Sequence, residues 1–409
     1  MASLDRVVVV GASLAGLRAA ETLRQVGWSG VLTIVSDENE MPYDRPPLSK
    51  KLLSGEWEPD RIRLRRPDDF AGLNAEWILG DRAVSLDTSN RVLTLASGRA
   101  LSFDGIVIAT GTSVRRLPGQ PDWPGVHTLR SLTDSLALRS ELEAGRRVVV
   151  IGAGFIGLEV AATARSKGCD VTVLEGAEAP MMRGLGATMG RRAALVHADH
   201  GVDVRCGVGV DGFVQGADGR VAGVRLTGGE VVPAEVVVVG IGVVPATQWL
   251  DGSGLTVRDG VVCDEFLCAG PIGVFAAGDV VRWPHRLLDR EVRVEHWTNA
   301  SEQGAAAAKN LVASFSGHDQ VAYAEVPFFW SDQFASRIQF LGRAEPDDDV
   351  EVVVGSPDDR AFVALYHRDG RLTAALGVSR PKQVMPFRKL LAERASIDEA
   401  RALVATFTL

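Results

Sequence analysis

The chain reads VVVIGAGFIG at residues 148–157, a run of β-branched residues that ends in closely spaced glycines. The apolar run is typical of a strand in a parallel sheet covered on both faces. The glycines are typical of a dinucleotide site: the first makes a tight turn, the second lets the backbone approach the pyrophosphate, and the third packs helix against strand. With an alanine-rich helix over 158–167 and a second strand over 171–174, this stretch predicts a βαβ unit.

A second copy of the pattern opens the chain. A strand over 7–10 precedes the glycine segment 11–16, a helix over 17–26 and a second strand over 31–35. Ser13 replaces the middle glycine, which adds a Cβ and a hydroxyl where phosphates would approach most closely. The repeat, at a separation of about 140 residues, predicts two nucleotide-binding domains in one chain.

Each second strand is followed by an acidic residue that can accept hydrogen bonds from ribose hydroxyls. Glu175 follows the later glycine segment by 18 residues, and Asp37 follows the earlier one by 21. Because Glu38 comes directly after Asp37, either of the two could bind ribose. A carboxylate at 175 disfavours a 2′-phosphate, so NADH is expected rather than NADPH. Arg183, nearby in the sequence, keeps NADPH open as an alternative.

Composition and charge exclude several classes of protein. The 409 residues are 46% hydrophobic and 23% charged, which predicts a globular chain of two to three domains. A net charge of −8 provides no broad positive field, so no nucleic-acid partner is expected. The longest apolar run, around 236–244, falls short of the roughly 20 residues that span a bilayer, so no membrane segment is expected. Four sparse cysteines and the absence of a leader pattern predict a cytoplasmic protein.

The remaining sequence adds strands and a separate C-terminal segment. Further apolar strands end in glycine at 106–111, 236–240 and 274–279, where glycine permits close approach to a ligand. After about residue 325 the sequence changes to short strands with turns between them, followed by one or two helices over 387–401. This segment predicts an α+β domain.

Cysteine and metal chemistry are not favoured. Cys263 and Cys268 have the Cys-x4-Cys spacing of a redox pair, but they precede the strand at 274–279 in a segment that reads as a loop. The histidines show no spacing with cysteines or acids that is typical of a metal site, so no metal is expected.

Several further motifs accompany the two glycine segments in chain order: Pro42-Tyr43-Asp44-Arg45-Pro46-Pro47-Leu48-Ser49-Lys50, Ala109-Thr110-Gly111, Ala277-Gly278-Asp279, Glu295-His296-Trp297 and Trp330-Ser331-Asp332-Gln333. Together they resemble the oxygenase-coupled NADH-dependent ferredoxin reductases, among the glutathione-reductase-like flavoproteins. The resemblance covers nearly the whole chain. It implies an α/β fold with two Rossmann-like dinucleotide-binding domains, for FAD and NAD, plus a C-terminal α+β domain. The implied boundaries are 1–112 with 248–325 for FAD, 113–247 for NADH and 326–409 for the C-terminal domain.

The resemblance also implies two sets of cofactor-binding residues. Those for FAD are Gly11, Ser13, Ala15, Gly16, Asp37, Arg45, Lys50, Ala83, Arg130, Asp279 and Trp297. Those for NAD are Gly152, Gly154, Phe155, Ile156, Gly157, Glu175 and Gly242. Lys50 and Glu159 resemble a catalytic pair beside flavin N5 and the nicotinamide. From the residues alone, Lys50 could be a solvated side chain, and Glu159 could simply favour the helix dipole.

The implied activity is that of an FAD-dependent NADH:ferredoxin reductase. Electrons would pass from NADH through FAD to a [2Fe-2S] ferredoxin that feeds a haem monooxygenase or Rieske oxygenase, because nicotinamide gives electrons in pairs and a ferredoxin takes one. The alternatives are a rubredoxin or nitrite reductase component and an NADH-responsive flavoprotein like apoptosis-inducing factor. Ferredoxins of this type are usually acidic, so a local basic surface is expected at Arg65–Arg66, Arg115–Arg116 or 380–389. A monomer or homodimer is expected.

Overall fold

The computed structural model describes residues 3–407, and its contacts divide the chain into two compact units. Unit 1 is made of Met1–Asp44, Ile62–Ser113 and Val244–Pro327. Unit 2 is made of Arg45–Arg61, Val114–Val243 and Phe328–Leu409. Each unit is therefore assembled from separate stretches of the chain.

Unit 1 is built on a five-stranded parallel sheet in the order β19-β7-β1-β2-β3. The strands are Arg6–Val10 (β1), Val31–Val35 (β2), Ala75–Ile78 (β3), Gly105–Ile108 (β7) and Val274–Ala276 (β19). Val7 to Val10 are all buried, as a strand covered on both faces requires. Helices α1 (Leu14–Gln25) and α7 (Trp297–Ser316) pack so closely that a Cβ on Gly304 would lie 2.2 Å from the Ala15 carbonyl oxygen.

Smaller elements complete unit 1. Two three-stranded sheets have the orders β4-β5-β6 and β18-β20-β21. Their strands are Ala83–Asp87 (β4), Val92–Leu95 (β5), Ala100–Ser102 (β6), Val261–Val262 (β18), Val281–His285 (β20) and Arg290–Val292 (β21). The short helices are α3 (Pro67–Gly72) and η3 (Gln248–Leu250).

Unit 2 repeats the parallel architecture with the order β12-β11-β10-β16-β9. The strands are Val126–His127 (β9), Arg147–Ile151 (β10), Asp170–Glu175 (β11), Asp203–Cys206 (β12) and Val236–Val239 (β16). The helices are α4 (Leu132–Glu141), α5 (Phe155–Ser166) and α6 (Met182–Asp199). An antiparallel meander follows with β13 (Val210–Gln215), β14 (Val221–Leu226) and β15 (Val231–Pro233). The segment 45–61 adds η1 (Pro46–Ser49) and α2 (Lys51–Ser54).

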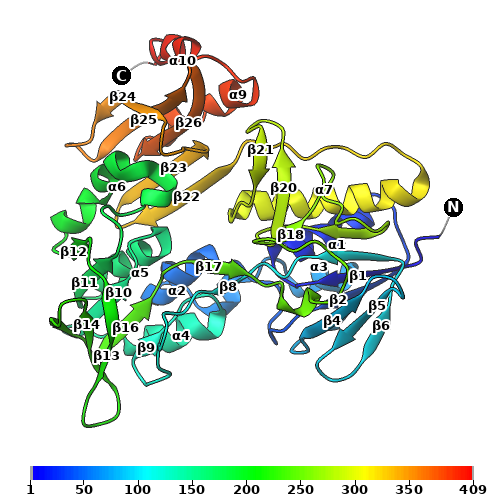
Figure 1. The fold of residues 1–409 in the computed structure, drawn as a ribbon, viewed down its shortest axis with the longest axis horizontal. Coiled ribbons are helices and arrows are strands. Elements are labelled where there is room, and N and C mark those ends of the chain that lie inside the picture. The colour runs from blue at the N-terminus through cyan, green and yellow to red at the C-terminus, as the bar shows by residue number, and fades with distance from the viewer. Residues whose placement is uncertain (1–2, 408–409) are drawn as a thin grey trace. The chain divides into compact units, whose positions relative to one another are not determined.

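The C-terminal part of unit 2 is an antiparallel sheet in the order β22-β23-β26-β25-β24. Its strands are Phe328–Gln333 (β22), Ser336–Gly342 (β23), Asp349–Ser356 (β24), Ala361–Arg368 (β25) and Arg371–Val378 (β26). The helices α8 (Pro381–Val384), α9 (Phe387–Ala392) and α10 (Ile397–Val404) end the described chain. Strand β22 packs against α5, and both lie beside α6 in Figure 1. Buried residues of this sheet and of β10 belong to one hydrophobic core.

These observations confirm the predicted fold class, an α/β protein with two Rossmann-like parallel sheets and a C-terminal α+β segment. The boundaries of the three domains stay a prediction. Strands β8 (Thr112–Val114) and β17 (Val243–Pro245) lie in sequence where the chain passes between the units.

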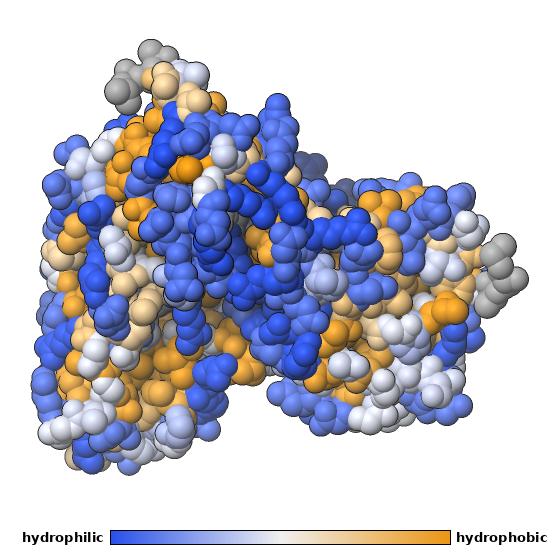
Figure 2. Space-filling model, turned by 45° about the horizontal axis from the view of Figure 1, so that its top comes forward, coloured by the Kyte–Doolittle hydropathy of each residue, from blue (hydrophilic) through white to orange (hydrophobic). Residues whose placement is uncertain are grey.

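On the face drawn in Figure 2, hydrophilic and hydrophobic residues are interspersed. No helix within residues 3–407 is long and apolar enough to cross a membrane.

Candidate functional site

The first glycine of each segment makes the same tight turn. Gly11 has φ +111° and Gly152 has φ +105°, a backbone region that side chains disfavour. A Cβ on Gly11 would lie 2.2 Å from the Ala109 carbonyl oxygen, and one on Gly152 would lie 2.4 Å from that of Gly240. The chain thus crosses the end of a neighbouring strand at a distance that only glycine allows.

The third glycine of each segment packs the helix onto its strand. A Cβ on Gly16 would lie 1.8 Å from the Gly11 carbonyl oxygen, and one on Gly157 would lie 2.1 Å from that of Gly152. Real Cβ atoms do not approach a backbone oxygen this closely, so both positions require glycine.

The middle position of each segment points to a different constraint. No heavy atom lies within 4 Å of a Cβ placed on Gly154, which is the N-cap of α5. Protein packing therefore does not require glycine there, whereas a phosphate held by the N–H groups of the helix N-terminus would. Ile156, in the first turn of α5, is 52% exposed although it is a large apolar residue. Ser13 is the matching N-cap of α1, with a similar extended backbone. These features fit a dinucleotide at each turn.

The acids at the ends of the second strands differ in their surroundings. Glu175 accepts hydrogen bonds from the backbone amides of Ala153, at 2.6 Å, and Ala177, at 2.8 Å. Its carboxylate is thereby fixed at the glycine turn of unit 2. In unit 1, Glu38 accepts a hydrogen bond from the Tyr43 hydroxyl, while Asp37 lies exposed beyond β2. This difference favours Asp37 over Glu38 as the ribose acceptor.

The other predicted NAD residues lie in unit 2 around the same turn. Phe155 begins α5, and its ring contacts that of Phe329 with centroids 4.7 Å apart. Gly242 follows β16 with φ +102°, and a Cβ there would lie 3.4 Å from Arg183 Nη1. The arginine noted in the sequence is therefore a neighbour of a predicted NAD residue.

Several of the predicted FAD residues of unit 1 lie on α1 or α7 or beside them. A Cβ on Gly278 would lie 3.0 Å from that of Ala15, and Asp279 follows directly. Trp297, the first residue of α7, is 37% exposed and donates from Nε1 to Asp44 Oδ1 at 2.7 Å. Ala83 is buried at the start of β4.

Sequence reasoning missed Gln303 on α7. Its Oε1 accepts a hydrogen bond from the Gly278 amide at 2.9 Å, and its side chain is fully buried. This bond fixes the glycine turn that precedes Asp279. No signal in the sequence pointed to Gln303, because its partner is the backbone of a turn 25 residues away.

The remaining predicted FAD residues belong to unit 2. Arg45 donates from Nη1 to the Arg130 carbonyl at 2.6 Å, and the Arg130 amide donates to Asp134 Oδ2 at 3.0 Å. The structure therefore brings Arg45 and Arg130 together. The FAD set as a whole divides between the two units.

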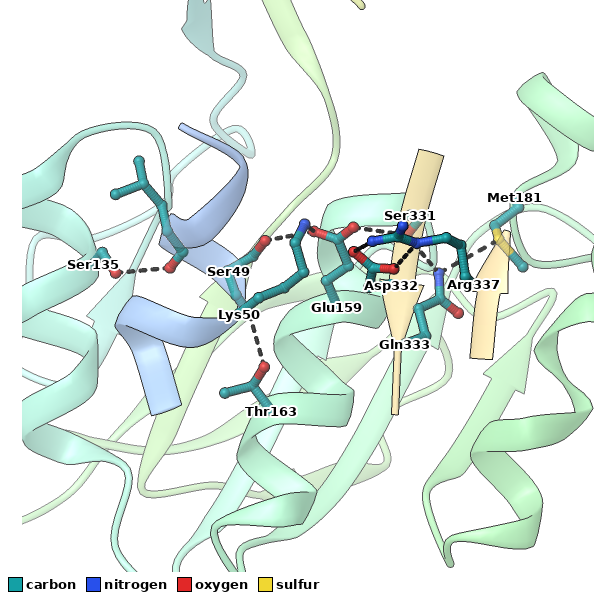
Figure 3. A network of polar contacts seen from close by, with 11 residues as sticks. Ser49, Lys50, Ser135, Glu159, Thr163, Met181, Ser331, Asp332, Gln333 and Arg337 are labelled. Atoms are coloured by element: carbon teal, nitrogen blue, oxygen red, sulfur yellow. Dashed lines mark hydrogen bonds and ion pairs between the residues drawn. The ribbon is translucent and has the colours of Figure 1, made fainter. Parts of the chain in front are cut away.

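Lys50 and Glu159 form an ion pair in unit 2, seen in Figure 3. Lys50 Nζ lies 2.8 Å from Glu159 Oε2, and the two side chains are 17% and 6% exposed. The Ser49 hydroxyl donates to the same oxygen, and the Ser331 hydroxyl donates to Oε1 at 2.7 Å. A carboxylate buried in this way needs charged or hydrogen-bonding partners, and here it has three. Lys50 is therefore a largely buried partner in an ion pair and not a solvated side chain.

Two further contacts hold the segment that carries Lys50. Thr163 of α5 donates to the Ser49 carbonyl at 2.8 Å, and Ser135 of α4 donates to the Leu48 carbonyl at 2.7 Å (Figure 3). Both hydroxyls are buried. The lysine is therefore presented by a backbone that α4 and α5 anchor.

The cysteines give no support to disulfide chemistry. All four are free, and Cys263 is buried in unit 1. Burial raises the pKa of the Cys263 thiol, which keeps it protonated and unreactive at neutral pH. Within residues 3–407, no three His, Cys, Asp or Glu side chains gather in a way that could hold a metal ion.

A chain with two such glycine turns, each on its own parallel sheet, has the architecture of oxidoreductases that bind two dinucleotides. Residues 5–304 match the pyridine nucleotide-disulphide oxidoreductase family, and residues 328–409 match the reductase C-terminal family. The protein belongs to the pyridine nucleotide-disulphide oxidoreductase family and is an oxidoreductase.

The similarity to known proteins covers nearly the whole chain. Rhodocoxin reductase of Rhodococcus erythropolis is 38% identical over 404 residues, 98% of this chain and 93% of the relative. The ferredoxin–NAD(+) reductase component of the anthranilate 1,2-dioxygenase system of Burkholderia cepacia is 38% identical over 401 residues, 97% and 96% of the two chains. The crystal structure of the covalent putidaredoxin reductase–putidaredoxin complex matches with a TM-score of 0.90 at 34% identity, covering 95% of this chain and 93% of that chain. The resemblance to ferredoxin reductases of oxygenase systems is thus confirmed.

Proposed function

We propose that this protein passes electrons from NADH through FAD to a [2Fe-2S] ferredoxin that serves an oxygenase. The observation that carries the proposal is the similarity over almost the full length to ferredoxin–NAD(+) reductase components such as that of Burkholderia cepacia. The two glycine turns, with open space at Gly154 and an acid after each second strand, support it independently.

In this proposal each unit holds one dinucleotide. The turn of unit 1, with Asp37, would bind the adenosine half of FAD. The turn of unit 2, with Glu175, would bind NADH. The bound flavin would supply the conversion between electron pairs and single electrons.

The residues of the chain supply position and charge. The helix N-termini after the glycine turns provide free N–H groups for the phosphates. The Glu175 carboxylate, held by the Ala153 and Ala177 amides, presents acceptors for ribose hydroxyls and repels a 2′-phosphate. Lys50 would place a positive charge where electron density rises during reduction, and Glu159 fixes the position of that charge.

The visible spectrum of the purified protein, taken before and after anaerobic addition of NADH or NADPH, tests the proposal. We expect flavin bands that NADH bleaches faster than NADPH, followed by multiple turnovers when an oxidised [2Fe-2S] ferredoxin is added. A colourless protein that binds no FAD would refute the assignment. Turnover with rubredoxin but not with ferredoxin would identify rubredoxin as the electron acceptor. NADH binding without turnover would indicate a regulatory flavoprotein. The cytoplasmic location and the monomeric or homodimeric state stay predictions.

A further inference from the structure

A line of fully buried polar side chains leads to Glu159 from the C-terminal sheet. Ser331 and Gln333 of β22 and His197 of α6 are each 0% exposed. Burying a polar group costs free energy unless it is hydrogen-bonded, so polar groups in such a place need partners. Each of these three side chains has one, and the line ends at the Glu159 carboxylate.

The hydrogen bonds run in one direction. Gln333 Nε2 donates to Ser331 Oγ at 3.1 Å, so the single proton of the Ser331 hydroxyl is left for Glu159 Oε1, 2.7 Å away. Gln333 Oε1 lies 2.9 Å from His197 Nε2. Because an amide oxygen only accepts, the histidine must carry its proton on Nε2. Burial lowers the pKa of His197, so the ring is neutral.

Strand alternation explains how β22 supplies this line. Ser331 and Gln333 are two residues apart and share one face of the strand. Asp332 lies on the other face, where its carboxylate pairs with Arg337 at 2.6 Å (Figure 3). The face turned to α5 therefore carries neutral donors, and the acid of the same segment points away.

We propose that Ser331 and Gln333 are positioning residues for the proposed reaction: they hold the Glu159 carboxylate in one orientation and, through it, Lys50. The proposal rests on the proposed function. Lys50 and Ser49 both donate to Oε2, and Ser331 supplies the hydrogen bond to Oε1 among the described residues. Without Ser331, the carboxylate can rotate about its last torsion, and Oε2 no longer has a fixed position for Lys50. The C-terminal sheet thereby sets the geometry of the pair.

The test is a double-mutant cycle with Ser331→Ala and Glu159→Ala. At saturating NADH, Ser331→Ala is expected to slow flavin reduction about tenfold, the loss of one charge-assisted hydrogen bond, with the KM for NADH changed less than about twofold. Ser331→Thr, which keeps the hydroxyl, restores the rate. In the Glu159→Ala background, Ser331→Ala has no further effect. An equal loss in both backgrounds would overturn the proposal. If Glu159→Ala does not fold, the Lys50→Met background serves the same purpose.

A second readout needs no turnover. In thermal unfolding of the full-length chain, Ser331→Ala is expected to lower the midpoint less in the Glu159→Ala background, where only the hydrogen bond from Gln333 is still lost, than in the wild-type background. Additive shifts would contradict a direct coupling of the two residues.

Gln339 on β23 offers a matched control for Gln333. Both glutamines are buried and donate weakly to a methionine sulfur, but only Gln333 joins Ser331 to His197. Gln333→Leu should slow flavin reduction, and Gln339→Leu should not. Equal rates in the two variants would refute the role of Gln333. A wild-type protein that NADH fails to bleach would instead refute the proposed function, which separates the two failures.

Discussion

The Glu175 carboxylate accepts a hydrogen bond of 2.6 Å from the Ala153 amide, which joins the end of β11 to the glycine turn after β10. The acid is thus part of the turn itself. Its second oxygen accepts from Ala177, so the orientation of the carboxylate is determined by backbone on two sides. An acceptor fixed in this way can discriminate between a ribose hydroxyl and a phosphate at the same position.

Glu175→Ala should weaken NADH binding and reduce the preference over NADPH. Loss of a charged acceptor costs about 1.5–3 kcal/mol, so the KM for NADH should rise about tenfold to a hundredfold with little change in the rate at saturation. Steady-state kinetics with both nucleotides measures this. Asp170→Ala, at the opposite end of β11, is the control. An unchanged ratio of the two kcat/KM values would contradict the role of Glu175.

Lys50→Met should slow flavin reduction by NADH. The substitution removes the positive charge paired with Glu159 while keeping most of the side-chain volume, and we expect a loss of at least about tenfold, or about 1.4 kcal/mol. Stopped-flow bleaching at saturating NADH provides the rate. Lys51→Met is the matched control because Lys51 is exposed and pairs with Glu56. If both variants reduce at the same rate, Lys50 has no part in the reaction.

Gly154→Ala and Gly157→Ala should separate ligand binding from folding. A Cβ at 154 meets open space, so the thermal midpoint should hardly change while NADH binding weakens. A Cβ at 157 would lie 2.1 Å from a backbone oxygen, so that variant should lose about 1–3 kcal/mol or more of stability. Calorimetric unfolding and NADH titration measure the two effects. Unchanged NADH affinity in Gly154→Ala would argue that no phosphate lies at this turn.

The free energy of unfolding should fall as the pH decreases from about 7 to 5. Burial lowers the pKa of His197 below its usual value of about 6.5, so the unfolded chain binds more protons in this range and is favoured. The pKa of His285 is lowered by burial in the same way. Each such histidine contributes a slope of up to about 1.4 kcal/mol per pH unit.

Urea unfolding across this pH range checks the histidine contribution. In His197→Gln, the change in the free energy of unfolding per pH unit should be smaller than in the wild type by the contribution of one histidine. This holds whatever the absolute stability of the variant. His318→Gln, at an exposed position, is the control. A slope that stays the same in His197→Gln would show that this ring does not titrate between folded and unfolded states.

Electron transfer to a ferredoxin should slow as salt rises, whereas reduction by NADH should not, because screening weakens attraction between charged surfaces. Among the basic segments, Arg65 already donates twice to Glu21 and Arg116 pairs with Asp122. Lys382, which is exposed, is therefore the preferred position to test. Lys382→Glu should slow ferredoxin reduction more than Arg66→Glu does. A rate independent of salt would indicate an apolar docking surface.

The fold could be predicted because its determinants are local. In each copy the valine run and the glycines, at 11 and 16 or at 152 and 157, lie within a few residues of one another. The structure has the expected tight turn at the first glycine and the expected close packing of helix on strand at the third. The pair of Lys50 and Glu159 came from a family resemblance, since 109 residues separate them in the chain. Their roles, like those of the other site residues, stay predictions.

The supporting side chains could not be predicted from sequence. Ser331 lies 172 residues from Glu159, and its strand reads FFWSDQ, in which polar residues on both faces suggest a solvated end. Only the packing of β22 against α5 shows that one face is buried. The same holds for Gln303, whose partner is the backbone of a distant turn. Hydrogen bonds between distant segments leave no periodic signal.

The short connection between β22 and β23 has a consequence for charge. Gln333 and Ser336 pair across a two-residue turn, and this turn sets the register of the whole hairpin. A slip by one residue would exchange the faces of β22 and point the Asp332 carboxylate at α5, where Glu159 is buried. Two carboxylates would then compete for a single lysine. The two-residue length of the turn at 334–335 therefore keeps a second carboxylate away from Glu159 on α5. An insertion there should reduce activity more than is usual for an insertion at a hairpin turn.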